Sequence, residues 1–438
     1  MRYRDYVLGK RIAVIGIGPH GEMLADIKFF VKSNALVSVY DLRSEGRLLE
    51  HATTLRSFGL ANLVLGHIPA EDLIDMDLII LSHEYPRTSS FLTEARNQGV
   101  EIEYPETLFL KLAPPVTVVG IMGACGKSAV MSMLTPMLDA TCAANGQECV
   151  SVDPESVSGI LTNLRKLKSG DVVVMKIVAS IMQEINALRW SPQIAIFTTT
   201  PSRSSYKISP FELIGNQTYN NYVIAHDQII DEVRASGFQT KAKLLRTKAS
   251  VVPIEWLPNA DAPCDRDNAA LALEAARVLK TTDETAQAVL VKWKPLKGRI
   301  ERLKKIRGVD IVNDSASLNP ESTIAALASV SKNRNVVLIF GGADHGADYR
   351  EFYSAVKKYA HTAVVIPGSG TLRERQYIHR LDDVHVISAP SVEEAVRQAM
   401  DHAKRGDVIL YSPAFDVGGI DVSRRERSER FLRAVRTL

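Results

Sequence analysis

A glycine-rich stretch, VTVVGIMGACGKSAVMSML at 116–134, has the residue types and spacing of a phosphate-binding loop. The β-branched run Val116 to Val119 predicts a strand that stops at glycines, and an apolar helical pattern follows Gly126. In such loops the glycines let backbone N–H groups turn toward an anion, and the helix directs its positive end there. Lys127 can then reach the outer phosphates, and the Ser128 hydroxyl can ligate magnesium. The stretch therefore predicts nucleotide binding by Gly123, Ala124, Cys125, Gly126, Lys127 and Ser128.

A second glycine pattern lies near the N-terminus, in AVIGIGPHGEML. Gly16, Gly18 and Gly21 form G-x-G-x-x-G directly after an apolar run, which is typical of a nucleotide-binding loop but is a weak signal alone. Asp41 ends the next predicted strand, where an acidic residue can hold a ribose hydroxyl, and Arg43 is a possible phosphate partner. The alternative is that these glycines only allow the strand and helix to pack closely.

Short β-branched runs separated by helical patterns must position these loops. They lie at Ile12 to Ile15, Val37 to Tyr40, Leu78 to Leu81, Val116 to Val119, Val172 to Ile177, Ile194 to Phe197, Val309 to Val312, Val336 to Phe340, Ala363 to Ile366, Val384 to Ile387 and Val408 to Tyr411. Alternation of this kind predicts an α/β fold with parallel sheets and helices on both faces.

Length and proline placement suggest how the chain is divided. At 438 residues it exceeds one ordinary core. Ala113-Pro114-Pro115 precedes the phosphate-loop strand, and a second break lies near Lys294-Pro295. We therefore expect three domains, at 1–113, 114–295 and 296–438: a Rossmann-like domain, a phosphate-loop domain and a second Rossmann-like domain.

Bulk composition narrows the partners and the compartment. The chain is 46% hydrophobic and 24% charged, and its net charge of +3 is too small to predict binding to nucleic acid or to an acidic membrane. Its 4 cysteines show neither C-x-x-C spacing nor a histidine at ligand spacing, which predicts reduced thiols and no structural metal. The charged N-terminus lacks an apolar signal core, so we expect a cytoplasmic protein.

Several further segments, taken together with both loops, resemble the Mur ligases of peptidoglycan synthesis, and most of all those that add D-glutamate to UDP-N-acetylmuramoyl-L-alanine. The segments that carry the resemblance are GIMGACGKS, GDVVVMKIVASIMQE, DRDNAALALEAA, LKGRIERLKKIRGVDIVNDSASLNP, GGADHGADY and SPAFDVGG…RRERSERF. They occur in the family's order and span nearly the whole chain.

The resemblance implies an ATP-dependent amide ligase that forms an acyl phosphate, which an amino acid amine then attacks. Lys127 would neutralise the transferring phosphoryl group, Ser128 would hold Mg²⁺, and the loop amides would cradle the β-phosphate. Arg299 and Asp314 match third-domain residues that reach the nucleotide, and Asn268 matches an adenine contact.

The resemblance also implies small-molecule substrates, namely a UDP-sugar peptide precursor and an amino acid, and we expect a monomer. Gly18, Asp41 and Arg43 would hold the uridine diphosphate end of the precursor. His345 stands at the position of a lysine that binds the incoming amino acid's carboxylate.

The chain departs from the family at positions that carry chemistry. Lys176 replaces a magnesium-binding glutamate, and Ser202 and Arg203 stand where the family has an acid and an imidazole. The position of a carbamylated lysine falls near Asn216 and Gln217. The remaining departures are Ala316, Asp267 and His345, and Val417 or Gly418. A second metal site built from these side chains is not credible, because Mg²⁺ needs oxygen ligands.

One hypothesis keeps Lys176 in the catalytic set. Its ammonium would place a fixed positive charge where the second Mg²⁺ would sit, and a unit charge pair at about 4 Å is worth roughly 4 kcal/mol at an effective dielectric near 20. Two alternatives to the D-glutamate ligase remain open. One is a degenerate homologue that binds nucleotide or UDP-sugar without turnover, and the other is a Mur-like ligase with altered substrates.

Overall fold

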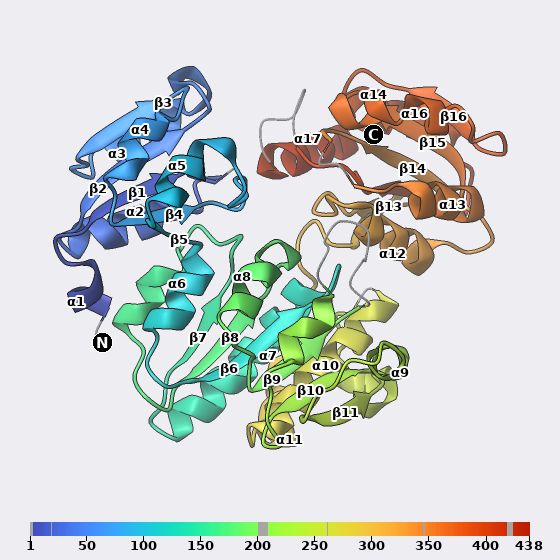
Figure 1. The fold of residues 1–438 in the computed structure, drawn as a ribbon. Helices are drawn as coiled ribbons and strands as arrows, with labels where there is room; N and C mark the ends of the chain where they lie inside the picture. The colour runs from blue at the N-terminus through green and yellow to red at the C-terminus, as the bar shows by residue number, and fades with distance from the viewer. Residues whose placement is uncertain (1–2, 19, 200–208, 261, 345–346, 418–423) are drawn as a thin grey trace. The chain divides into compact units, whose positions relative to one another are not determined.

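The computed structural model describes residues 3–18, 20–199, 209–260, 262–344, 347–417 and 424–438. Three β-sheets organise these residues, each flanked by helices (Figure 1). The predicted α/β fold is confirmed. Among the described residues, no helix has the length and apolar character needed to cross a bilayer.

The first sheet belongs to the N-terminal part of the chain. Its elements are α1 (Tyr3–Val7), β1 (Arg11–Ile15), α2 (Leu24–Lys32), β2 (Leu36–Asp41), α3 (Leu49–Arg56), β3 (Asn62–Leu65), α4 (Ala70–Ile74), β4 (Leu78–Leu81), α5 (Thr93–Asn97), β5 (Glu101–Glu103) and α6 (Pro105–Leu112). All its strand pairs are parallel, in the order β3-β2-β1-β4-β5. The carboxyl ends of β1, β2 and β4 therefore meet at one edge, which brings Gly16, Asp41 and Ser82 to the same place.

The second sheet contains the phosphate-loop strand. Its elements are β6 (Thr117–Met122), α7 (Lys127–Ala144), β7 (Cys149–Val152), the 3₁₀ helix η3 (Leu161–Arg165), β8 (Val172–Lys176), the 3₁₀ helix η4 (Ala179–Ile181), α8 (Met182–Ala187), β9 (Ile194–Phe197), β10 (Tyr222–His226), α9 (Asp227–Ala235), β11 (Lys243–Thr247), α10 (Pro263–Val278) and α11 (Asp283–Leu290). The strand order is β11-β10-β9-β6-β8-β7.

Strand β6 continues through Gly120 to Met122, so the expectation that it stops at the first glycine is wrong. A Cβ atom at Gly120 would lie 2.8 Å from Cδ1 of Ile177 and 2.9 Å from Cγ of Pro192. Gly120 therefore serves close packing inside the sheet layer, and the loop begins only at Gly123.

The third sheet is built from β12 (Glu301–Ile306), β13 (Val309–Asn313), α12 (Pro320–Val330), β14 (Val336–Gly341), α13 (Arg350–Tyr359), β15 (Ala360–Ile366), α14 (Ser369–Arg373), α15 (Arg375–Ile378), β16 (His385–Ser388), α16 (Val392–His402), β17 (Val408–Tyr411) and α17 (Arg424–Arg436). Its strand order is β12-β13-β17-β14-β15-β16. Strand β12 pairs antiparallel with β13, whereas the pairs β13–β17, β17–β14, β14–β15 and β15–β16 are parallel.

Both faces of this third sheet are covered. Phe340 of β14 faces one hydrophobic cluster with Phe352 of α13, and Ile339 faces the other with Phe431 of α17. Successive residues of a strand point to opposite faces, so β14 contributes to both clusters. Figure 1 shows α12 and α13 on one side of the sheet and α16 and α17 on the other.

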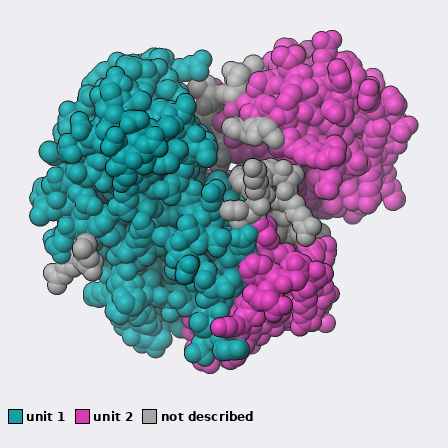
Figure 2. Space-filling view, in the orientation of Figure 1, with its two compact units in different colours: residues 1–120, 138–195, 212–221 teal, residues 121–137, 196–211, 222–438 magenta. Residues whose placement is uncertain are grey.

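The chain divides into two compact units (Figure 2). One contains residues 1–120, 138–195 and 212–221, and the other contains 121–137, 196–211 and 222–438. Each of the predicted domain ranges, 1–113, 114–295 and 296–438, holds one sheet. The domain boundaries themselves stay a prediction.

Within the first unit, a buried carboxylate ties α2 to η3. Asp26 accepts hydrogen bonds from the backbone N–H groups of Ile160 at 3.0 Å and Leu161 at 2.8 Å. Burial raises the pKa of Asp26 to about 7, although these N–H donors act in the opposite direction. The side chain thus caps amide groups at the start of a 3₁₀ turn that lies more than a hundred residues away in sequence.

Candidate functional site

The phosphate loop between β6 and α7 requires its glycines. Gly123 has φ +148° and Gly126 has φ +85°, in the region that L-residues with a side chain rarely adopt. A Cβ atom at Gly123 would lie 2.1 Å from Oγ1 of Thr198, and one at Gly126 would lie 2.6 Å from Oδ1 of Asn268. The backbone therefore turns tightly here and brings Asn268, on α10, against the loop.

Two backbone N–H groups of the loop converge on one oxygen atom. Ala124 and Cys125 both donate to Oγ1 of Thr199, at 2.9 and 3.4 Å. Lys127 donates through Nζ to the carbonyl oxygen of Gly123 at 2.5 Å, and Ser128 is half-buried in the first turn of α7. Convergent amides at the start of a long helix, beside a lysine, form an anion-binding arrangement. The neutral Thr199 hydroxyl stands where the amides would otherwise meet an anion.

Cys125 contributes its thiol to this loop. Burial raises its pKa, while Thr199 and the positive charges of Lys127 and Arg299 act in the opposite direction. Asp314 also contributes to the shift, so Arg299 and Asp314 lie within electrostatic reach of the loop in the same compact unit. The structure thus brings together the loop and three residues that the sequence assigned to nucleotide binding: Asn268, Arg299 and Asp314.

Asp314 follows β13 and is held by third-sheet donors. The backbone N–H of Ile300 donates to it at 3.1 Å, and the Ser412 hydroxyl donates at 2.6 Å. Burial raises the pKa of Asp314 to about 6, against the hydrogen bonds and the charge of Arg299. The carboxyl group is therefore fixed in place by its hydrogen bonds.

Arg427, in the C-terminal segment that carries the resemblance, has a structural role. Arg427 of α17 is fully buried and donates to the carbonyl oxygens of Phe415 at 2.9 Å and Asp416 at 2.6 Å. A buried guanidinium with charge-assisted bonds to backbone oxygens holds the 413–417 turn onto the sheet. This explains why an arginine is needed four residues before the core side chain of Phe431.

Lys176, at the end of β8, is engaged by two acids. Its side chain is buried, and its Nζ lies 2.7 Å from Oδ2 of Asp153 and 3.3 Å from Oε2 of Glu155, both of which follow β7. Sequence reasoning missed these two partners, because neither lies in a recognisable motif. Two carboxylates surround one ammonium group, so its charge is balanced within the protein.

The fit of Mg²⁺ to these residues differs between the two predicted positions. A buried ammonium at the end of β8 does not fit a divalent cation, and among the described residues no three His, Cys, Asp or Glu side chains gather as a metal site. The hydroxyl of Ser128 fits a single oxygen ligand whose remaining partners would be nucleotide oxygens and water. Ser128 as a metal ligand stays a prediction.

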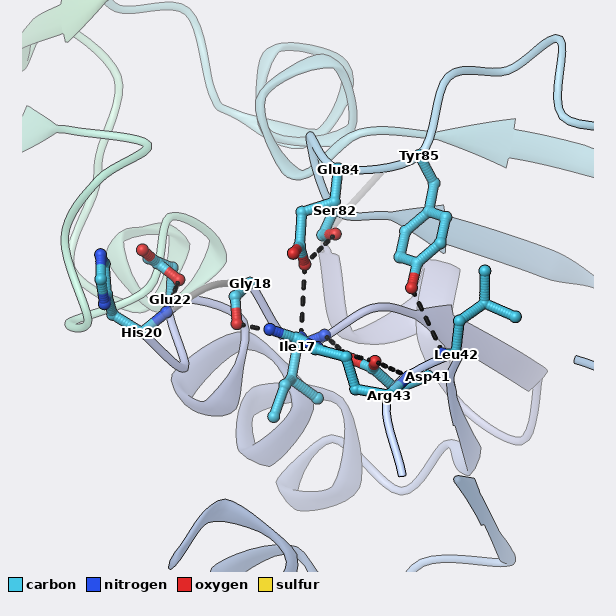
Figure 3. Close-up of polar contacts among 10 residues, drawn as sticks. All are labelled: Ile17, Gly18, His20, Glu22, Asp41, Leu42, Arg43, Ser82, Glu84 and Tyr85. Carbon is cyan, nitrogen blue, oxygen red and sulfur yellow. Dashed lines mark hydrogen bonds and ion pairs between the residues drawn. The ribbon is translucent and has the colours of Figure 1, made fainter. Parts of the chain in front are cut away.

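The glycine loop of the first sheet brings its three predicted residues together (Figure 3). Asp41 is fully buried and accepts hydrogen bonds from the backbone N–H groups of Ile17 at 3.2 Å and Arg43 at 2.9 Å. The Arg43 guanidinium lies 2.6 Å from Oδ2 of Asp41 and donates to the carbonyl oxygen of Gly18 at 3.2 Å. Asp41 therefore holds the loop backbone at Ile17 and the side chain of Arg43 in place.

The loop after β4 adds residues that sequence reasoning missed. Glu84 lies 3.4 Å from the Arg43 guanidinium, and the Tyr85 hydroxyl accepts a hydrogen bond from the backbone N–H of Leu42 at 3.3 Å. On the other side of the loop, the Glu22 carboxylate accepts the backbone N–H of His20 at 2.9 Å. Figure 3 shows these acidic side chains around the loop.

A hydrogen-bonded group centred on His83 lies in the same compact unit. Nε2 of His83 is 2.6 Å from Oε1 of the fully buried Glu106, and Nδ1 is 3.4 Å from the hydroxyl of Ser180 in η4. Burial lowers the pKa of His83, but the carboxylates of Glu106, Glu22 and Glu155 together raise this pKa above its ordinary value. Tyr104 stacks on the imidazole at 5.4 Å. Only the fold could reveal this group, because 97 residues separate His83 from Ser180.

Four positions that the sequence analysis named fall outside the described residues: His345, Ser202, Arg203 and Gly418. Gln217, near the position of the family's carbamylated lysine, is buried and donates to the carbonyl oxygen of Pro192 at 2.8 Å.

Comparison with known proteins finds a matching domain model and full-length relatives. Residues 298–415 match the model for the Mur ligase, glutamate ligase domain. The chain is 25% identical over 436 residues to the UDP-N-acetylmuramoylalanine–D-glutamate ligase of Clostridioides difficile, covering 93% of this chain and 94% of that protein. It is 26% identical over 466 residues to the enzyme of that name from Thermoanaerobacter pseudethanolicus, covering 98% and 99%.

Solved structures agree with this on the fold. A murein peptide ligase from Psychrobacter arcticus superposes with a TM-score of 0.58 at 14% identity, covering 98% of this chain and 99% of that one. The UDP-N-acetylmuramate–alanine ligase of Thermotoga maritima gives a TM-score of 0.58 at 15% identity, with the same coverage. Residues 298–415 are thus a Mur ligase glutamate ligase domain, and the chain as a whole resembles the Mur ligases. The predicted resemblance is confirmed.

Proposed function

We propose that this chain is an ATP-dependent acid–amino acid ligase of peptidoglycan precursor synthesis. The proposed reaction adds D-glutamate to UDP-N-acetylmuramoyl-L-alanine through an acyl phosphate. The observation that carries the proposal is the phosphate loop, where the amides of Ala124 and Cys125 converge on one oxygen beside Lys127. The relatives that share the chain's length bear the name of this ligase.

The chain's own residues divide the work as follows. The loop amides hold phosphate oxygens, and Lys127 balances the charge that develops on the transferring phosphoryl group. Asn268, against Gly126, contacts the nucleotide base, and Arg299 supplies a second cation. Mg²⁺, held by Ser128 and by nucleotide oxygens, would shield phosphate charge. His345 would contact the carboxylate of the incoming amino acid.

The role of Lys176 is the part of this proposal that its contacts challenge most. An ammonium that is bound by Asp153 and Glu155 offers less charge to a phosphate than an unpaired one would. If Lys176 substitutes for a second metal, a Lys176→Glu variant should gain activity at raised Mg²⁺ concentration. An unchanged Mg²⁺ dependence would remove Lys176 from the catalytic set.

The ion-paired Lys176 favours a second candidate, a Mur ligase homologue that binds nucleotide without turnover. The absence of the expected carboxylate at the end of β8 supports it directly. A ligase with altered substrates is a further form of the first candidate, since His345 and Val417 change the residues expected at the amino acid end.

Phosphate release from ATP separates these candidates. Purified protein is incubated with Mg²⁺, UDP-N-acetylmuramoyl-L-alanine and a panel of amino acids, with Lys127→Ala as the matched inactive variant. Release that requires D-glutamate supports the proposed reaction, and release with a different amino acid supports altered substrates. ATP binding without release, under conditions where an ordinary family member turns over, supports the second candidate.

The proposal extends to setting and assembly. We expect the protein to act in the cytoplasm as a monomer on small-molecule substrates, which size-exclusion chromatography with light scattering would test at the level of assembly.

A further inference from the structure

The acidic side chain of Glu22 occupies the glycine loop of the first sheet. Its Oε2 accepts the backbone N–H of His20 at 2.9 Å. A Cβ atom built on Gly18 would lie only 2.2 Å from the same oxygen, so the carboxylate rests directly against the α-carbon of Gly18. Figure 3 shows Glu22 beside both residues.

Gly18 is the second glycine of the G-x-G-x-x-G pattern. In loops of this type the second glycine has no side chain so that a pyrophosphate can approach the backbone closely. In this chain, a carboxylate of the protein has taken that place. A carboxylate and a phosphate both bind as oxygen anions to backbone N–H groups, so the two compete for the same donors.

The surroundings of the loop add to this competition. Arg43, the predicted phosphate partner, lies 2.6 Å from Asp41 and 3.4 Å from Glu84. Burial raises the pKa of Glu84, and the charges of Asp41 and Glu22 add to the shift while Arg43 opposes it. The carboxylates of Glu22 and Glu84 thus act on one another across the loop. An incoming diphosphate would meet like charge on both sides.

We propose that Glu22 determines ligand specificity in the first domain by weakening the binding of a diphosphate at the glycine loop. This rests on the proposed function in that it takes a uridine-containing compound as the ligand of this domain. The natural chain therefore binds the nucleoside part with little gain from the diphosphate, and neutralising Glu22 opens the loop to phosphate oxygens.

The test compares uridine and UDP as probes by isothermal titration calorimetry on the full chain. In the natural protein, UDP should bind no more than about threefold more tightly than uridine. Glu22→Gln keeps the side-chain length but removes the charge, so it should tighten UDP binding about tenfold, equivalent to about 1.4 kcal/mol, and leave uridine unchanged. Glu84→Gln should give a smaller gain, because Asp41 still holds Arg43.

Glu45→Gln is the matched control, since Glu45 carries the same charge in the same sheet domain but is exposed and paired with Arg56 at 2.6 Å. It should change neither affinity. Thermal unfolding of each variant confirms that it is folded, and Glu22→Ala provides a second test if Glu22→Gln unfolds.

Two results would overturn the proposal. One is UDP binding that already exceeds uridine binding tenfold in the natural protein and does not improve in Glu22→Gln, which leaves the ligase proposal intact. The other is the absence of uridine and UDP binding in both proteins, which also removes the UDP-sugar from the proposed function. ATP titration in the same samples reports separately on the phosphate loop.

Discussion

The glycine loops that follow β6 and β1 each lie between a parallel strand and a helix, and their amides have different occupants. In the phosphate loop, the N–H groups of Ala124 and Cys125 meet the neutral hydroxyl of Thr199. In the first-sheet loop, the N–H of His20 meets the charged carboxylate of Glu22. A hydroxyl yields to a phosphate at little electrostatic cost, whereas a carboxylate resists the approach of another anion. We therefore expect similar backbone patterns to differ in how readily they accept a phosphate.

The largest effect should come from the phosphate-loop lysine. Lys127→Ala removes the ammonium that would balance the outer phosphates, and we expect ATP affinity to fall by about 100-fold or more. Uridine binding should not change, because the first loop is separate in sequence and sheet. Fluorescence titration with a labelled ATP analogue measures this, with the exposed Lys166→Ala as control. Equal ATP affinity in Lys127→Ala and Lys166→Ala would contradict phosphate binding by the loop after β6.

Glycine substitutions should separate the two loops next. Gly126→Ala would place Cβ 2.6 Å from Oδ1 of Asn268 at φ +85°, and Gly18→Ala would place it 2.2 Å from the mobile end of Glu22 at φ +81°. Both carry backbone strain on the order of 1–2 kcal/mol. Only Gly126→Ala displaces a residue predicted to contact the nucleotide, so ATP affinity should fall about tenfold in that variant alone. A matching loss in Gly18→Ala would show that the loops are coupled.

The pH dependence of stability tests the role of Asp26, the buried carboxylate that ties α2 to η3. The folded-state pKa of Asp26, about 7, lies above its ordinary value near 3.8, so the folded protein holds a proton that the unfolded chain releases. Stability should therefore rise as pH falls from about 7 toward 4, by up to about 1.4 kcal/mol per pH unit from this group. Urea unfolding between pH 8 and 5 should show a shallower dependence in Asp26→Asn. Identical slopes in the two proteins would assign the effect to other groups.

The smallest effect is expected at Thr199. If its hydroxyl only fills the loop until a nucleotide arrives, Thr199→Val should change ATP affinity by less than about threefold while lowering stability by about 1 kcal/mol. Calorimetric titration and thermal unfolding of the same sample measure both quantities. A tenfold loss of ATP affinity would instead make Thr199 a ligand-binding residue. The Thr199 hydroxyl would then not be a simple placeholder to set against the Glu22 carboxylate.

Much of the fold could be predicted from local pattern. The apolar run at 12–15 became β1, that at 336–340 became β14, and that at 408–411 became β17, because buried parallel strands are apolar throughout. Strands β3, β5, β7, β10, β11 and β12 were not predicted. The sequences of β11 and β12, KLLRT and ERLKKI, are too charged to resemble buried strands, and both strands lie at sheet edges.

The site divides in a similar way. Spacing predicted a glycine-rich turn between a strand and a helix, because its geometry resides in consecutive backbone groups. Phosphate binding by this turn stays a prediction. Glu22, Asp153 and Glu106 could not be predicted, since each matters through a contact that only the folded chain creates. The 2.7 Å ion pair between Lys176 and Asp153 joins the ends of two neighbouring strands, and no sequence motif marks it.

Strand β12 has a consequence for how the third sheet meets other molecules. It is an edge strand, and three of its six residues, Arg302, Lys304 and Lys305, are exposed and positively charged. An open sheet edge is a template on which another polypeptide can add a strand, and a row of lysines and arginines repels a second copy of itself. This edge therefore protects the domain against self-association into extended β-structure at the high concentrations that a newly made protein can reach in a cell.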